Sequence, residues 1–211
     1  MFRAGGVCLL IDGIIFIILI PLFFVIGEMG GGEEALKFIA ENDLLLRTTV
    51  GLSALAPAFF VPGMLALYLS MKDIRRTHTV ISTGLFGLAM TLFLGSTIVQ
   101  YSLIELGKGY MGATDAAQRA AYVAVSELAG RAATAGETLG TIFFSVAVLI
   151  MAMVMLKGVF SRATAYLSII NGLVGVVSSI PITALGLLSI ISTVILAVWF
   201  LVVGYTLYKM G

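Results

Sequence analysis

Asp12 is the residue with the clearest chemical potential, because it stands in the middle of a long apolar stretch near the start of the chain. A carboxylate at the centre of a membrane helix costs about 2.5–3.5 kcal/mol on insertion scales and usually faces a partner or a water-filled cavity. At about 1.5 Å per residue, Asp12 lies about 12 Å inside the stretch that begins at Ala4. Asn171 enters a later stretch from the same side and is expected at the same depth. We predict a hydrogen bond between the two, which serves either as a proton or cation site or as a packing contact.

A second polar group gathers where the apolar stretches should end on the opposite side. Its members are Asp43, Arg47, Gln100, Glu105, Glu127, Arg131 and Glu137. Glu127 precedes Arg131 by four residues, the favoured order for an ion pair on a helix, and the stretch with Gln100 and Glu105 should end near Arg47 and Glu137. Two interpretations stay open: charges that anchor helix ends at the membrane interface, or a polar vestibule that binds a ligand or ion.

The composition argues against several other chemistries. One cysteine, Cys8, excludes an internal disulfide, and one histidine, His78, with it argues against a zinc or haem site built from protein ligands alone. Enzymes of the bilayer usually need a histidine cluster, a metal set or a nucleophile with its base, so an enzyme is the least favoured class and we expect no catalytic residue, metal or cofactor. A net charge of +1 gives no reason to expect a nucleic-acid partner.

Six long apolar stretches must hold these residues. The chain is 60% hydrophobic and 11% charged, with a mean hydropathy of +1.14, whereas a soluble domain carries about 25% charged residues. A bilayer core needs roughly 20 apolar residues per helix. We therefore predict one all-α domain over residues 1–211, a bundle of six transmembrane helices. The predicted spans are Ala4–Ile26, Thr48–Leu69, Val80–Glu105, Glu137–Leu156, Ala163–Ile180 and Leu185–Leu207. Pro181 marks the expected hairpin between the last two.

Charge is sorted by sign between the two sides of this bundle. One side, with both termini, carries Asp73 as its single acid against seven basic residues: Arg3, Lys72, Arg75, Arg76, Lys157, Arg162 and Lys209. The other side carries nine acids against five basic residues. Since cytoplasmic loops are enriched in Lys and Arg, we expect a multi-pass protein of the cell membrane with both termini cytoplasmic.

Two segments on the acidic side have helical periodicity. In Glu33–Asn42 the charges at 33, 37 and 41 recur every four residues, which indicates a short amphipathic helix. From Thr114, a candidate N-cap, Asp115–Leu128 shows a polar stripe opposite an apolar face. We expect two separate outer helices whose apolar faces, including Leu128, are shielded from water.

Small residues follow one side of the third stretch, at Gly84, Gly87, Thr91 and Gly95. Such residues let helix backbones approach closely in membranes. Besides membrane lipids, the expected partners are therefore a second copy of the chain or another membrane protein.

Short polar motifs between the hydrophobic stretches resemble a known family. They are Arg3-Ala4-Gly5-Gly6, Glu41-Asn42-Asp43 with Arg47, Ala66-Leu67-Tyr68-Leu69, Gly140-Thr141-Ile142-Phe143-Phe144, and Lys157-Gly158-Val159-Phe160-Ser161-Arg162. The chain is similar to the DUF4386-like family of small prokaryotic integral membrane proteins, although Arg162 stands where that family often carries a proline. The resemblance implies a helical membrane bundle of unknown activity and supplies no site residues.

Three classes of function follow from these features. A protein that binds or transports a small molecule, ion or lipid would use Asp12 with Asn171 or the vestibule. A structural or accessory subunit would use the glycine faces, and an intramembrane enzyme has the least support. We favour binding or transport.

Overall fold

The computed structural model describes residues 1–26, 32–180 and 186–211. These residues form α-helices and no strand, so the predicted all-α class is confirmed. The helices are α1 (Phe2–Ile26), α2 (Glu33–Glu41), α3 (Asp43–Met71), α4 (Arg76–Gly112), α5 (Ala116–Met155), α6 (Arg162–Ser178) and α7 (Gly186–Met210). The predicted hairpin residue Pro181 lies outside the described residues.

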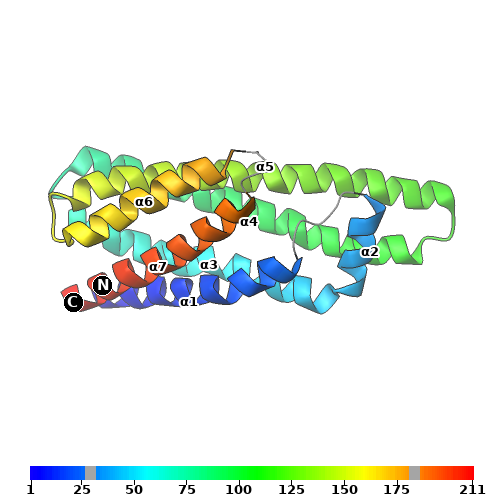
Figure 1. Ribbon diagram of the computed structural model, residues 1–211, viewed down its shortest axis with the longest axis horizontal. Helices are drawn as coiled ribbons and strands as arrows, with labels where there is room; N and C mark the ends of the chain where they lie inside the picture. Colours follow the sequence, from blue (N-terminus) through cyan, green and yellow to red (C-terminus); the bar gives the residue numbers. More distant parts are fainter. Residues whose placement is uncertain (27–31, 181–185) are drawn as a thin grey trace.

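Five helices are long and apolar enough to cross a membrane: α1, α3, α4, α5 and α7, the last over Ile190–Met210. The sixth candidate, α6, is apolar but has only 17 residues. The chain therefore has the helices of a membrane-embedded protein, while six spans remain an expectation. The helices other than α2 run roughly parallel to one long axis, and both termini lie at one end with the α3–α4 and α5–α6 connections (Figure 1). We call this the terminal end.

The opposite end is formed by the hairpin of α4 and α5, and we call it the hairpin end. With 37 and 40 residues, these helices are about 55 and 60 Å long, nearly twice the roughly 30 Å of a bilayer core. In Figure 1 the hairpin extends well past the ends of α1, α6 and α7. The predicted separate helix over Asp115–Leu128 is therefore wrong, since these residues begin α5.

The sequence explains why α5 continues without a break. Asp115 rather than Thr114 is the N-cap, and its side chain accepts a hydrogen bond from the Gln118 backbone N–H at 2.7 Å. No proline follows before Met155, and alanines favour the helix from its first turn. Leu128, which we expected to be shielded, is 72% exposed because this part of α5 projects from the bundle.

The amphipathic helix predicted at Glu33–Asn42 is confirmed as α2, which packs mainly on α4. Leu36 and Ile39 are buried, at 0% and 3% exposure. Gly107 of α4 makes this approach possible, because a Cβ added there would lie 2.8 Å from Ile39 Cγ2 and 3.0 Å from the Leu36 carbonyl oxygen. The α2 helix thus crosses α4 of the hairpin (Figure 1), with Gly107 at the contact.

The middle of the bundle is closed by aromatic rings from four helices. We define the aromatic core as Phe60, Phe86, Phe144, Trp199 and Phe200, all at most 6% exposed. Neighbouring ring centroids lie 5.2–6.2 Å apart, mostly edge to face. Such arrangements are favoured by the ring quadrupoles. The core thus occupies the middle of the bundle, between α3, α4, α5 and α7.

Candidate functional site at the hairpin end

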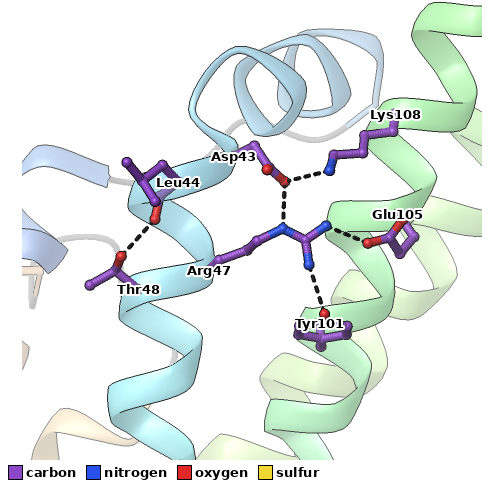
Figure 2. Close-up of polar contacts among 7 residues, drawn as sticks. All are labelled: Asp43, Leu44, Arg47, Thr48, Tyr101, Glu105 and Lys108. Carbon is purple, nitrogen blue, oxygen red and sulfur yellow. Dashed lines mark hydrogen bonds and ion pairs between the residues drawn. The ribbon is translucent and has the colours of Figure 1, made fainter.

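Arg47 is the centre of a charged cluster that joins α3 to α4 (Figure 2). Its Nε donates to Asp43 Oδ1 at 2.9 Å, its Nη1 donates to the Tyr101 hydroxyl at 2.7 Å, and its Nη2 donates to Glu105. Lys108 Nζ lies 3.2 Å from the same Asp43 oxygen. We call these five residues the Arg47 cluster. The predicted approach of Arg47 to Glu105 is confirmed.

In this cluster, Asp43 and Arg47 each stabilise the charged form of the other. Burial raises the pKa of Asp43, but hydrogen bonds from Lys108 and Arg47 outweigh it and hold the pKa below its ordinary value. The Glu105 hydrogen bond raises the pKa of Arg47 further above its already high value. Asp43 is therefore an anion and Arg47 a cation at any physiological pH.

Exposure limits what each of these pairs contributes. The Glu105 and Lys108 side chains are 57% and 46% exposed, and Arg47 itself is 28% exposed. Ion pairs in contact with water are worth little individually and are screened by salt. The cluster therefore sets the register of α3 against α4 rather than supplying most of the fold's stability.

The other predicted members of the polar group lie farther along α4 and α5. Gln100 Nε2 donates to Glu137, which confirms that these two ends meet. The expected ion pair between Glu127 and Arg131 is absent from the described part of the chain, which contradicts that prediction. Glu127 lines a pocket instead. An ion pair between exposed side chains one turn apart on a helix would contribute only about 0.3–0.5 kcal/mol of stability.

That pocket lies between the start of α2, the end of α4 and the head of α5. Its volume is about 470 Å³, and its lining comprises Glu33, Tyr110, Ala116, Arg119, Ala120, Val123, Ala124 and Glu127. Pockets of about 300–1,000 Å³ are typical of small-molecule sites. The alanines leave the space open, while two carboxylates, a guanidinium and a phenol provide both signs of charge and neutral hydrogen bonding.

Contacts on one wall hold the polar groups of the pocket in place. Lys37 lies 2.6 Å from Glu33, and the hydrogen bonds from Lys37 and then Tyr110 lower the pKa of Glu33. The hydrogen bond that the Tyr110 hydroxyl donates to Glu33 raises the pKa of Tyr110, and Tyr110 is only 3% exposed. Across the pocket, Arg119 Nε donates to the Ala113 carbonyl at 3.3 Å. Glu33 is thus an anion and Tyr110 a neutral phenol at neutral pH.

The other predicted site, Asp12 with Asn171, is not assembled. Both are buried, at 0% and 5% exposure, but neither Asp12 oxygen has a hydrogen-bond partner among the described residues. The reason is the helix arrangement: α1 packs against α3 and α7, whereas α6 packs against α5 and α7. Gly172, next to Asn171, lies against Leu149 of α5. Equal depth in the membrane did not make the two side chains neighbours.

Several residues of this region were not among the predicted site residues. Tyr101 and Lys108 were missed, although they stand four residues before and three residues after the predicted Glu105, so all three share one face of α4 and this spacing was available as a signal. Glu33, Tyr110 and Arg119 lie on three separate helices. Nothing in the sequence indicates that they meet, because their proximity depends on where α2 crosses the hairpin.

Comparisons with protein-family models, with curated proteins and with solved structures found no match to this chain. The functional argument therefore rests on the site itself.

Proposed function

We propose that this chain is a six-span protein of the cell membrane that binds a small zwitterionic solute at the hairpin end, outside the membrane. The observation that carries the proposal is the pocket of about 470 Å³ in which Glu33, Glu127 and Arg119 bring both signs of charge to one space. A ligand with an ammonium and a carboxylate would complement these groups.

The six-span topology is supported by the position of the ends. Both termini lie at the terminal end, which requires an even number of crossings, and α6 would supply the sixth at about 26 Å. The basic residues of that end support a cytoplasmic location for it, by the positive-inside rule. The pocket would then face the outside.

Binding is better supported than transport through one copy of the chain. Among the described residues, the aromatic core occupies the middle of the bundle between the pocket and the terminal end, and Phe60 and Phe86 are at most 1% exposed. The pocket, by contrast, is lined by the end of α4 and the head of α5, and this part of the hairpin projects from the bundle (Figure 1). We therefore assign solute recognition rather than passage as the primary activity.

The test is a thermal-shift screen of the purified full-length protein in detergent, using amino acids, simple amines and simple carboxylates. We expect stabilisation by zwitterions above that by either single-charge class. Arg119→Ala and Glu127→Gln should abolish the shift, whereas Arg131→Ala, an exposed position outside the pocket, should preserve it. Equal shifts in Arg119→Ala and the wild type, or no shift with any solute, would contradict the proposal.

A second candidate function, a subunit of a homo-oligomer or membrane complex, is favoured by one observation. A Cβ added at Gly84, Gly87 or Gly95 of α4 would meet nothing within 4 Å. Among the described residues the predicted small-residue face is thus open, although such faces in membranes usually receive a second helix.

Cross-linking in native membranes tests this second function. In a Cys8→Ser background, Gly87→Cys should form a disulfide-linked dimer on oxidation if α4 meets α4 of a second copy. Ile14→Cys, on a lipid-exposed part of α1, is the matched control and should stay monomeric. Failure of Gly87→Cys to cross-link above this control would exclude a symmetric α4 interface.

A further inference from the structure

Asp12 is a fully buried acid that does not belong to the outer pocket. Its exposure is 0%, and both carboxyl oxygens lack a hydrogen-bond partner in the described part of the chain. Buried polar groups are nearly always paired, so each unpaired one requires an explanation. A residue of this kind in the middle of an apolar helix is a functional-site candidate by default.

The surroundings of Asp12 are tightly packed. On the α7 side, a Cβ added at the adjacent Gly13 would lie 2.7 Å from the Leu201 side chain and 3.2 Å from the Ala197 carbonyl oxygen. On the α3 side, Leu9, one turn away, presses directly on Gly63. Helix α1 thus packs closely against both neighbours on either side of Asp12.

The other titratable groups of α1, α3 and α7 lie toward the helix ends, except the Cys8 thiol. On α1 they are Arg3 and the thiol of Cys8, one turn from Asp12. On α3 the titratable groups are Asp43 and Arg47 at one end and Tyr68 at the other, followed by Lys72. On α7 they are Tyr205, Tyr208 and Lys209, all in the last turns. Leu201 of α7 and Gly63 of α3, which lie against Gly13 and Leu9, stand between these two sets along their helices.

We propose that Asp12 is a proton-binding site that keeps α1 closed against α3 and α7 while it is protonated, and opens this contact when the proton is lost. An ionised carboxylate without a partner is far costlier to bury than a neutral one. The closed contact therefore selects the neutral acid. On opening, the O–H bond breaks, the proton passes to an entering water molecule, and the carboxylate that remains is hydrated.

A proton fits this site better than a metal ion. Hard cations take several oxygen ligands, and the described residues contain no cluster of three acidic, histidine or cysteine side chains that could hold a metal. The site is separate from the solute pocket, so the two proposals can be tested independently of each other.

Infrared spectroscopy of the wild-type protein in lipid vesicles provides the first test. The sequence has four aspartates, Asp12, Asp43, Asp73 and Asp115, and only Asp12 is within a predicted span. Labelling with carbon-13 aspartate should reveal one protonated carboxyl band at neutral pH that disappears as the pH rises. A fully ionised set of aspartates at neutral pH would overturn the proposal. So would a band that responds to sodium in place of potassium but not to pH.

Cys8 reports the opening itself, because it is the only cysteine and lies one turn from Asp12. Its rate of alkylation by a neutral maleimide is divided by the rate in Asp12→Asn at each pH, which cancels the thiol's own pH dependence. Asp12→Leu serves as a second reference if Asp12→Asn does not fold. We expect this ratio to rise severalfold with pH. A negative charge on Asp12 without opening would disfavour the thiolate and lower the ratio, so a constant or falling ratio contradicts the proposal.

Discussion

The two halves of this molecule are held together by different forces. Between the terminal end and the middle, rings and glycine contacts pack the helices closely, and Asp12, the one buried acid among the described residues, has no hydrogen-bond partner there. At the hairpin end, Arg47 alone contacts three polar side chains, yet several of the groups involved are about half exposed.

This difference shows that burial, not the number of polar contacts, sets what a polar residue is worth. Exposed ion pairs each contribute about 0.2–1 kcal/mol at most, and their groups stay available to solvent and ligands. A buried acid has a larger effect, because burying its ionised form costs far more free energy than burying its neutral form. We therefore propose that its charge state decides whether the helix contact around it stays closed. Changes in the aromatic core should therefore unfold the protein, whereas changes at the hairpin end should alter local order and binding.

The largest expected effect is that of Phe60→Ala. Phe60 is 1% exposed and contacts three other rings, so its truncation should cost about 3–5 kcal/mol of unfolding free energy. Phe24, which is 70% exposed on α1, is the matched control, and Phe24→Ala should change stability by less than about 0.5 kcal/mol. Unfolding in detergent measures both. Equal losses would remove the distinction between a packed core and a lipid-facing surface.

A smaller, local effect is expected from Gly107→Ala, which places a methyl group against Ile39 and Leu36. An overpacking cost of about 1–3 kcal/mol corresponds to about 5- to 150-fold faster opening of α2. Hydrogen exchange of the α2 amides measures this rate, while the exchange of α3 and α7 amides should stay unchanged. Gly112→Ala, where an added Cβ meets nothing within 4 Å, should leave α2 as protected as in the wild type.

Acid should produce the smallest effect, through Asp43. Its folded-state pKa lies below the ordinary value because the hydrogen bonds from Lys108 and Arg47 outweigh burial, so its contribution is complete above pH about 4 and is lost as the pH falls below that. A nitroxide at Glu34→Cys in a Cys8→Ser background should gain mobility in this range, more at low salt than at high salt. The Asp43→Asn variant should lose the part of this mobility change that Asp43 causes. If the variant responds to acid as the wild type does, the change belongs to another group.

The sequence predicted the helices better than the contacts between them. Apolar runs located the long helices, and charges at every fourth residue located α2. The extension of α5 was missed because residues 116–136, alanine-rich and charged, lack the continuous apolar character that signals a span. The Asp12–Asn171 pair was wrong because residue counting gives depth along a helix but not which helices are neighbours. The same gap concealed the pocket, whose residues come from three helices.

The most direct test of the central claim, that the binding region projects beyond the bilayer while the rest is enclosed by lipid, uses two positions on α5. Leu128 and Met153 are 72% and 45% exposed and lie on opposite sides of Glu137. Nitroxides are placed there, one at a time, by Leu128→Cys and Met153→Cys in a Cys8→Ser background in lipid nanodiscs. We predict collisions with a water-soluble nickel complex at position 128 and with oxygen at position 153. Oxygen-dominated collisions at position 128 would place the hairpin in the membrane and contradict the account.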